Sequence, residues 1–422
     1  MAEPFNTPVP GATPVVGTPV PASTPRSTSP VQEMPHSSMA KPVVLHIGDI
    51  VRYNPATYAE FERHFYIVRP HRAERQRPDF MRGLREGRWG NFAAIFRPFW
   101  GSGGEMGNWD AELIGLLPAS CRVFASAGAG YDWADTKLLG ERGIVYCNSG
   151  LAAAEAVSDF AVAMVISTFR HLPWCISAAS ASPQAFRRSH GLATGLSHNL
   201  RGHVLGLVGM GNIGQKLAAK LGCPAFGMQI HYYDVVRKPH ALEQELGATY
   251  HATLAGLLGA SDCVVLCTPA SVDGKPLLTR AAIAQMKNGA RFVNVARGSL
   301  VDEEALAEAL EDEEDPMHPS DKNNNDDDDD KQPRIVGRLL AAAIDVHADE
   351  PNVHPRLLRL ASLEATTSYE YSAVPARLML TCHNAGGTVE THKGFEELCM
   401  RNILAVLNGQ PALTPVNLQH LK

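Results

Sequence analysis

Residues 209–214 read Gly209-Met210-Gly211-Asn212-Ile213-Gly214, and the spacing of their three glycines indicates a tight turn between a strand and a helix. Residues 203–208 form a mostly apolar run, typical of a buried parallel strand, and residues 215–221 have helical spacing. Gly209 permits the turn, Gly211 lets the backbone approach a ligand, and Gly214 lets the helix pack against the sheet. The N–H groups of the first helical turn, which contains Asn212 and Ile213, are expected to bind a pyrophosphate.

A carboxylate stands where such a site needs one to bind an adenosine ribose. Residues 229–233 are expected to form the next strand, and Asp234 ends it, about 20 residues past the last glycine. A carboxylate there accepts hydrogen bonds from the ribose hydroxyls and repels a 2′-phosphate, so the sequence predicts NAD as the cofactor. Arg237 and Lys238 follow closely and are able to meet a 2′-phosphate, which leaves NADP as the alternative.

Composition restricts the class of protein. A chain of 422 residues, 45% of them hydrophobic, is long enough for two domains with cores of their own. The net charge of −6 and the lack of a strongly basic face argue against nucleic acid as a partner. The longest apolar helix, expected at residues 152–169, carries Glu155 and Asp159 and is predicted to lie in a core and not in a membrane.

Cysteine usage and the N-terminus bear on the compartment. The eight cysteines are scattered, without the paired spacing of a zinc site or a disulfide framework. The N-terminus has neither the charged-then-apolar pattern of a signal peptide nor the arginine content of a transit peptide. We therefore expect no bound metal and a cytoplasmic location.

Alternating strand and helix patterns run through most of the chain. Residues 1–40 are dominated by Pro, Thr, Ser, Gly and Ala and are predicted to be a disordered tail. From residue 42 onward strands alternate with helices, which indicates parallel α/β sheets. Strands are expected at 43–47, 93–96, 123–127, 263–267, 291–295 and 341–346, and helices at 56–65, 112–117 and 152–170, with a final helix over 395–407.

A dense acidic run interrupts this pattern. Residues 311–334 contain Glu-Asp-Glu-Glu-Asp, three asparagines and five consecutive aspartates, and like charges at this density repel and stay solvated. We interpret the run as a surface insertion between a helix and a strand. A calcium site is the alternative, but the glycine and glutamate of an EF-hand loop are missing.

Three later segments each end an apolar run with side chains suited to catalysis. They are Asn294-Val295-Ala296-Arg297-Gly298, Asp345-Val346-His347-Ala348-Asp349-Glu350-Pro351 and Leu380-Thr381-Cys382-His383-Asn384-Ala385-Gly386. Ligands of open α/β sheets bind at the carboxyl ends of strands, so all three segments are expected to meet at one crevice. Together with the glycine turn, and in this order, they resemble the D-isomer-specific 2-hydroxyacid dehydrogenase family over about residues 42–415.

The resemblance narrows within the family to the fungal D-mandelate dehydrogenase branch, on residues 123–133, 197–206 and 345–347. It implies two doubly wound α/β domains: a Rossmann NAD-binding domain at 152–385, and a flavodoxin-like substrate domain at 41–151 and 386–422. It also implies a homodimer formed through the nucleotide domain, with a contribution from residues 152–200.

Catalytic roles follow from the same resemblance. Arg297 would hold the substrate carboxylate and polarise the C2 oxygen, since a guanidinium binds carboxylates bidentately. His383 would exchange the proton of the C2 hydroxyl, and Glu350 would orient its imidazole. Further cofactor contacts are expected from Thr268, Pro269, Val295, Ala296, Asp345, His383 and Gly386.

Substrate identity is expected to come from the first domain. Arg97 and the glycine-rich loop after it follow a strand, and Phe99 and Trp100 are placed to line an apolar side-chain pocket. Gly128 and Ala129 complete the expected substrate contacts. This loop departs from the mandelate-branch pattern, as does Asn384 beside the histidine, so mandelate itself does not follow.

The predicted function is NAD-dependent interconversion of (R)-2-hydroxy acids and 2-oxo acids with bulky or aromatic side chains. Glyoxylate or hydroxypyruvate reduction is an alternative, because it uses the same motifs. An NAD-sensing interaction protein of the corepressor kind, built on the same scaffold, is the alternative from another class.

Overall fold

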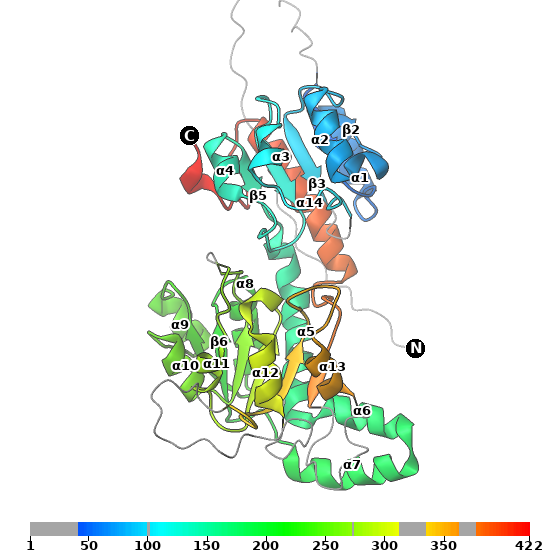
Figure 1. The fold of residues 1–422 in the computed structure, drawn as a ribbon. Helices are drawn as coiled ribbons and strands as arrows, with labels where there is room; N and C mark the ends of the chain where they lie inside the picture. The colour runs from blue at the N-terminus through cyan, green and yellow to red at the C-terminus, as the bar shows by residue number, and fades with distance from the viewer. Residues whose placement is uncertain (1–40, 99–101, 272–273, 312–334, 363–376) are drawn as a thin grey trace, which may run out of the picture. The chain divides into compact units, whose positions relative to one another are not determined.

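The structure is a computed structural model that describes residues 41–98, 102–271, 274–311, 335–362 and 377–422. The tail at 1–40, Phe99 and Trp100 of the substrate loop, and residues 312–334 of the acidic insertion lie outside the described residues. Residues 41–422 form one compact unit that contains two parallel sheets (Figure 1).

The first sheet has five strands. They are β1 (Val43–His46), β2 (Tyr66–Val68), β3 (Ala94–Arg97), β4 (Val123–Ser126) and β5 (Val145–Cys147). Their order is β2-β1-β3-β4-β5 and every pair is parallel. This is the flavodoxin-like order, so the predicted class of the first domain is confirmed.

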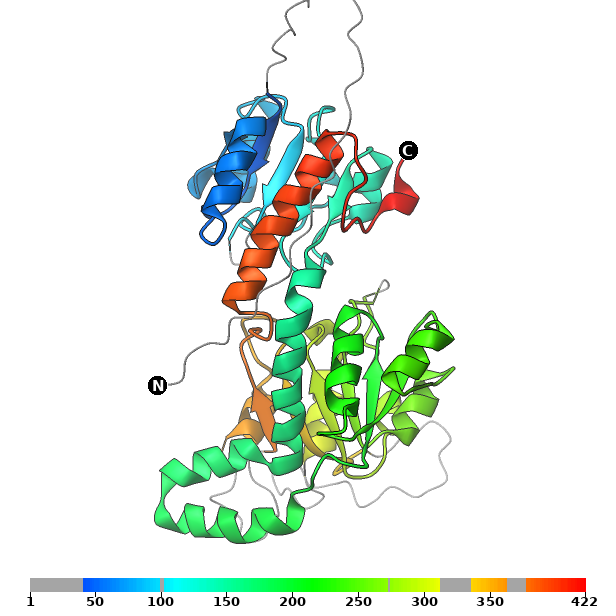
Figure 2. The same ribbon diagram turned by 180° about the vertical axis from the view of Figure 1, so that it is seen from behind.

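Helices cover both faces of the five-stranded sheet. One face packs against α1 (Pro55–His64) and α14 (Val389–Leu407), whose Cys399 and Ile403 share a core with Val44 and Phe96. Figure 2 shows α14 running along this sheet. The other face packs against α2 (Arg77–Arg85), α3 (Ala111–Gly115) and α4 (Thr136–Glu141).

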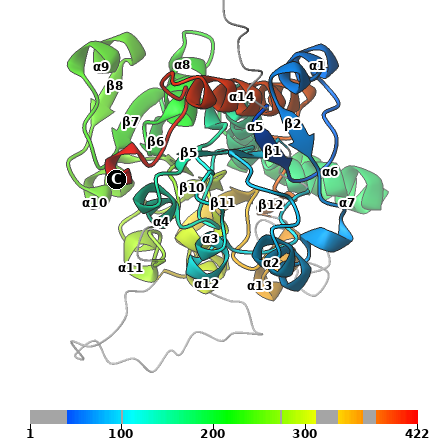
Figure 3. The same ribbon diagram turned by 90° about the horizontal axis from the view of Figure 1, so that it is seen from above.

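The second sheet has seven strands in the order β12-β11-β10-β9-β6-β7-β8, again all parallel. Figure 3 gives the view from above, in which the labels run from β8 at one side through β6 and β10 to β12. The strands are β6 (Val204–Val208), β7 (Gln229–Tyr233), β8 (Ala248–Tyr250), β9 (Cys263–Leu266), β10 (Ala290–Asn294), β11 (Leu339–Ile344) and β12 (Leu378–Leu380).

Alternate residues of these strands enter two separate cores, as pleated strands require. Val264 and Leu266 of β9 face a core with α10 (Leu254–Ala260), α11 (Arg280–Ile283), α12 (Glu303–Leu310) and α13 (Pro355–Ala361). Cys263 and Val265 face the opposite core with α5 (Gly150–Arg170) and α8 (Asn212–Gly222). Helix α9 (His240–Leu246) lies between β7 and β8 in the chain, and short 3₁₀ turns lie at Ala73–Arg75, Gly298–Leu300 and Leu418–His420.

The apolar helix α5 is long enough to cross a membrane by length and composition. Its Ala161, Met164 and Val165 are nevertheless fully buried against the seven-stranded sheet and α8. The prediction of a core helix agrees with this packing.

The segment between α5 and the glycine turn is more regular than its polar composition indicates. Residues 172–196 form a hairpin of α6 (Leu172–Ala181) and α7 (Pro183–Leu196). Each of the two helices has a proline within its first two positions, where the missing N–H would have no partner in the helix. Ser182 accepts a hydrogen bond from Ala185 N–H and so caps α7.

Candidate active site

The glycine turn lies where the strand order of the seven-stranded sheet reverses. β6 pairs with β9 on one side and β7 on the other, and residue 209 follows β6 directly. In open α/β sheets this switch point is where ligands bind.

The three glycines of the turn differ in what a side chain at each position would meet. Gly209 has φ of 102°, in the left-handed region, and a Cβ there would lie 2.8 Å from the Cys267 carbonyl oxygen. A Cβ on Gly214 would lie only 2.3 Å from the Gly209 oxygen. A Cβ on Gly211 would meet nothing within 4 Å, and Gly211 begins α8 without any side-chain cap. Open space therefore lies before uncapped helical N–H groups, which fits the pyrophosphate of a dinucleotide.

Asp234 follows β7 and is fixed against this turn. Its Oδ2 accepts a hydrogen bond from Met210 N–H at 2.8 Å, and Lys238 Nζ lies 3.1 Å from the same oxygen. Partial burial opposes ionisation, but the hydrogen bonds from Met210 and Lys238 outweigh it and lower the pKa of Asp234. The side chain is therefore a carboxylate throughout the neutral range.

The other predicted cofactor residues surround the same switch point. Thr268 and Pro269 follow β9, and the Thr268 Cα would lie 3.2 Å from a Cβ on Gly209. Val295 and Ala296 follow β10 and are buried, so their side chains pack into the cores. Asn212 is exposed and Ile213 half-buried in the first turn of α8.

Glu350 and His383, which are 33 residues apart, are in direct contact. His383 Nδ1 lies 2.8 Å from Glu350 Oε2, and a carboxylate only accepts, so the imidazole donates. Burial alone would raise the pKa of Glu350, but hydrogen bonds from His383 and from His347 N–H lower it. The backbone of His383 has φ of 52°, which is uncommon for a residue with a side chain.

Asp345 holds the turn that carries His383. Its carboxylate, 1% exposed, accepts hydrogen bonds from Thr381 Oγ1 at 2.7 Å, Asn384 N–H at 2.9 Å and Ala385 N–H at 3.0 Å. The His383 N–H donates to the Asp345 carbonyl at 2.7 Å. The cofactor contacts expected of Asp345 and of the half-buried Gly386 stay predictions.

Arg297 reaches the turn after β4 in the five-stranded sheet. Its Nε donates to Asp132 Oδ1 at 3.0 Å, and its Nη1 donates to its neighbour Ala296's carbonyl at 2.7 Å. A Cβ on Gly130 would lie 1.2 Å from Nη2, so the guanidinium occupies the space that a side chain at 130 would fill. The predicted substrate residues Gly128 and Ala129 precede Gly130 in this turn.

Two residues outside the sequence-predicted set position this guanidinium. Asn294, 1% exposed, closes the turn after β10 by donating to the Arg297 carbonyl and accepting from Ala296 N–H. Asp132 supplies the carboxylate partner. Both lie in stretches that carry the family resemblance, and that was the only sequence signal for them.

Arg97 is buried at the end of β3. Its Nε donates to the Gly103 carbonyl at 3.0 Å and its Nη1 to Ser126 Oγ at 3.1 Å. The guanidinium carbon lies 4.6 Å from the centre of the Trp133 ring, and burial lowers the pKa of Arg97. The predicted substrate role of Arg97 remains untested by these contacts.

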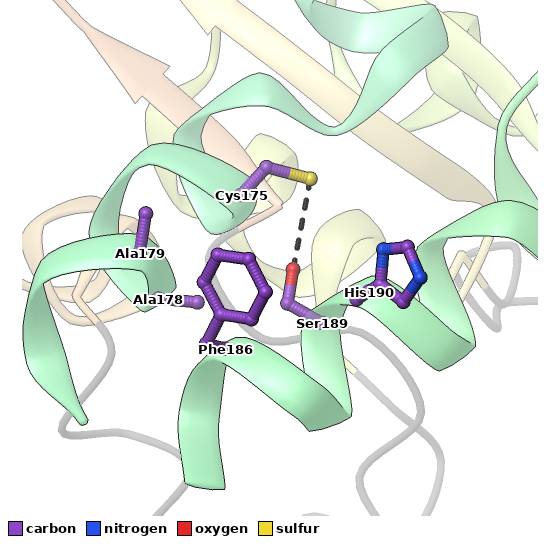
Figure 4. A pocket seen from close by; sticks show the side chains of 6 residues that line it. All are labelled: Cys175, Ala178, Ala179, Phe186, Ser189 and His190. Atoms are coloured by element: carbon purple, nitrogen blue, oxygen red, sulfur yellow. Dashed lines mark hydrogen bonds between the residues drawn. The ribbon is translucent and has the colours of Figure 1, made fainter. Parts of the chain in front are cut away.

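A separate hollow lies on the α6–α7 hairpin, lined by Cys175, Ala178, Ala179, Phe186, Ser189 and His190 (Figure 4). Ser189 Oγ lies 3.6 Å from Cys175 Sγ across it. It contains none of the predicted site residues. Among the residues that the structure describes, no three potential metal ligands converge anywhere.

Comparison with known proteins places this geometry among characterised enzymes. Residues 162–329 match the model of the "D-isomer specific 2-hydroxyacid dehydrogenase, NAD binding domain" family. The chain is 29% identical to the 4-methyl-2-oxopentanoate reductase A of Aspergillus oryzae, over 81% of this chain and 88% of that protein. It is 30% identical to the glyoxylate reductase of Thermococcus kodakarensis, over 74% of this chain and 81% of that protein.

A solved structure is similar over nearly its whole length. The holo D-mandelate dehydrogenase of Rhodotorula graminis superposes with a TM-score of 0.77 at 35% identity, covering 90% of this chain and 98% of that one. The predicted two-domain α/β class and the resemblance stated from the motifs are thus confirmed.

Proposed function

The chain belongs to the D-isomer-specific 2-hydroxyacid dehydrogenase family, and on that premise we propose that it interconverts (R)-2-hydroxy acids and 2-oxo acids with bulky or aromatic side chains, using NAD. Oxidoreduction of the 2-hydroxy acid and 2-oxo acid pair follows from the family. The preferred substrate, the choice of NAD over NADP and the residue roles are the proposal. The observation that carries it is the hydrogen bond between His383 and Glu350.

His383 is the proton-transfer group in this proposal. With the Nδ1 proton directed to Glu350, Nε2 is the nitrogen that exchanges a proton with the substrate oxygen. In reduction the imidazolium protonates the C2 oxygen, and in oxidation the neutral ring takes the hydroxyl proton. Glu350 stabilises the imidazolium and fixes the ring orientation. The nicotinamide ring, when bound, donates or accepts the hydride.

Arg297 is assigned to the substrate carboxylate. Its guanidinium adjoins the Gly130 turn, so a cation is available there to an anion. Nη2 donates to no acceptor among the described residues, whereas Nε and Nη1 each have one. A carboxylate arriving at this turn would complete the hydrogen bonding of the guanidinium.

The preference for NAD rests on Asp234 and on the two cations after it. Asp234 is ionised and would repel a 2′-phosphate. Lys238 is paired with Asp234 itself, and Arg237 donates two hydrogen bonds of 2.9 Å to Glu243 while stacking on Tyr250. Both cations are engaged by the protein, so neither is placed to offset that repulsion.

A substrate with a bulky side chain is favoured by the names of two relatives, a D-mandelate dehydrogenase and a 4-methyl-2-oxopentanoate reductase. The glyoxylate reductase relative keeps a small substrate as the second candidate. Rates on phenylglyoxylate, 2-oxoisocaproate and glyoxylate, each with NADH and NADPH, test the proposal. We expect the first two to exceed glyoxylate in kcat/KM with NADH, and a preference for glyoxylate or NADPH would overturn it. Failure to oxidise NADH with any 2-oxo acid would favour the corepressor-like alternative.

The proposal includes a homodimer in the cytoplasm. The α6–α7 hairpin exposes Ile176, Phe186 and Leu192, which a second copy would cover. All eight cysteines are free thiols, as a reducing compartment maintains them. Sedimentation at several protein concentrations tests the dimer. A monomer at micromolar concentration would overturn it.

The division into domains is also proposed. We assign residues 41–151 and 386–422 to the substrate domain, because α14 and the C-terminal segment pack on the five-stranded sheet. Residues 152–385 form the NAD-binding domain, with the acidic insertion at 311–334.

A further inference from the structure

We propose that His347 is a positioning residue that keeps Arg297, Glu350 and His383 in register. It follows β11 in the loop at 345–350, and the family resemblance assigns it no role. It lies in the same segment as Glu350 and is in contact with the segments of Arg297 and His383. The inference rests on the proposed function, because it concerns the same proton transfer.

The side chain joins the loop of Glu350 to the loop of His383. His347 Nε2 lies 2.9 Å from the Thr381 carbonyl oxygen, two residues before His383. A carbonyl only accepts, so Nε2 carries the proton and donates it. His347 is buried, with 8% of the residue exposed, which shields this hydrogen bond from competition by water.

The backbone of the same residue contacts the Glu350 carboxylate and the residue after Arg297. His347 N–H donates to Glu350 Oε1 at 2.9 Å, while Glu350 Oε2 accepts from His383. A Cβ on Gly298, the residue after Arg297, would lie 1.9 Å from the His347 carbonyl carbon. Glycine at 298 is therefore required for the Arg297 turn to approach the His347 backbone.

A purely apolar ring would pack in this space more cheaply than histidine. The Nδ1 of His347 is buried and has no hydrogen-bond partner among the described residues, which costs free energy. The imidazole is nonetheless present, and its one bonded nitrogen spans the two loops. We infer that the hydrogen bond from Nε2 to Thr381 offsets the cost of the unbonded Nδ1. It does so by holding His383 within hydrogen-bond distance of Glu350.

The test compares His347→Phe with His347→Gln in the full-length protein. Phenylalanine keeps an aromatic ring but has no donor, whereas the glutamine amide nitrogen reaches about as far as Nε2 and can donate to Thr381. We expect kcat for 2-oxo acid reduction to fall roughly tenfold to a hundredfold in His347→Phe, since small displacements of reacting groups have effects of this size. His347→Gln should stay within about threefold of the wild type, and NADH affinity should be unchanged in both.

The pH profile separates positioning from loss of stability. With Glu350 and His383 out of register the imidazolium is less stabilised, so the alkaline limb of reduction should move to lower pH in His347→Phe alone. Diethyl pyrocarbonate modifies the neutral imidazole of His383, and the modification can be followed on the peptide that contains His383, in protein free of cofactor. The pH dependence of this modification rate should also move to lower pH in His347→Phe. His46→Phe is the matched control, because His46 is buried and donates to the Asp49 carbonyl away from the dyad. His46→Phe should change thermal stability without moving the pH dependence of reduction or of His383 modification.

Two results would overturn the inference while leaving the function intact. One is an active wild type whose His347→Phe variant has the same kcat and the same pH profile. The other is an equal loss in His347→Gln, because then the donor to Thr381 is not what matters. An inactive wild type on every 2-oxo acid would instead contradict the proposed function.

Discussion

His383 Nδ1 lies 2.8 Å from Glu350 Oε2, and the second oxygen of the same carboxylate accepts the N–H of His347. The carboxylate is therefore held from two sides and cannot rotate without losing a hydrogen bond. A fixed carboxylate selects the imidazole tautomer that carries its proton on Nδ1, which leaves Nε2 for the proton exchange that we propose.

Replacing Glu350 by glutamine should impair proton transfer and leave the shape of the site intact. In Glu350→Gln the imidazolium loses its counter-charge, so we expect kcat to fall roughly a hundredfold. The alkaline limb of 2-oxo acid reduction should shift to lower pH. Steady-state kinetics between pH 5 and 9 measure both, and an unchanged profile would remove Glu350 from its assigned role.

The same substitution has a consequence for acid stability. The pKa of Glu350 is lower in the folded chain than in the unfolded one, where a glutamate has a pKa of about 4.3. Its contribution to stability is therefore present above the unfolded value and is lost as pH falls through the folded value. We expect the Tm difference between wild type and Glu350→Gln to shrink as pH falls from 6 toward 3. A difference that stays constant would show that the carboxylate is not stabilised by folding.

His383 can be removed in two ways that differ in backbone cost. Its φ of 52° is tolerated by asparagine but disfavoured for alanine by about 1 kcal/mol. Both His383→Asn and His383→Ala should lose kcat by roughly a thousandfold or more, with NADH binding largely kept. Only His383→Ala should also lose thermal stability. A loss of NADH affinity as large as the loss of kcat would contradict the assigned role.

Local sequence patterns predicted many of the strands and helices, because hydrophobic periodicity is a property of a single element and can be recognised without knowing its neighbours. The strand predicted at 229–233 agrees with β7, and the helical run predicted at 215–221 lies within α8, which begins three residues earlier. The short strands β2, β5, β8 and β12 were not predicted, because three residues carry too little periodicity. The α6–α7 hairpin was missed because its helices bury only a few residues, such as Trp174 and Ala193, against each other.

The motifs predicted which candidate side chains meet better than they predicted what holds those side chains in place. The contact of Glu350 with His383 was expected from the resemblance and is present in the structure. The pairing of Arg297 with Asp132 joins residues 165 positions apart, and no local pattern specifies it. The same holds for His347 and Thr381, whose contact depends on two strands lying side by side.

Gly130 should be required for Arg297 to keep its place. A methyl group at 130 would lie 1.2 Å from Arg297 Nη2, so the guanidinium must move in Gly130→Ala. Because Arg297 is proposed to bind the substrate carboxylate, its displacement should raise KM for 2-oxo acids roughly tenfold or more. NADH affinity should be unchanged. Gly115→Ala is the control, since a Cβ at 115 meets nothing within 4 Å, and it should match the wild type. Unchanged KM in Gly130→Ala would argue against Arg297 as the carboxylate ligand.

Asp234 should determine which dinucleotide is used. Asp234→Asn keeps an oxygen for Met210 N–H, removes the charge that repels a 2′-phosphate and releases Lys238 from its ion pair. We expect kcat/KM to rise about tenfold with NADPH and to fall with NADH. Because the pKa of Asp234 is lowered, the wild-type preference should not vary with pH across the neutral range. The control is Asp262→Asn. Asp262 precedes β9, pairs with Lys287 and accepts a hydrogen bond from Val204 N–H at the start of β6, so its loss should leave the ratio unchanged. If Asp234→Asn and Asp262→Asn gave the same NADH to NADPH ratio, Asp234 would not face the ribose.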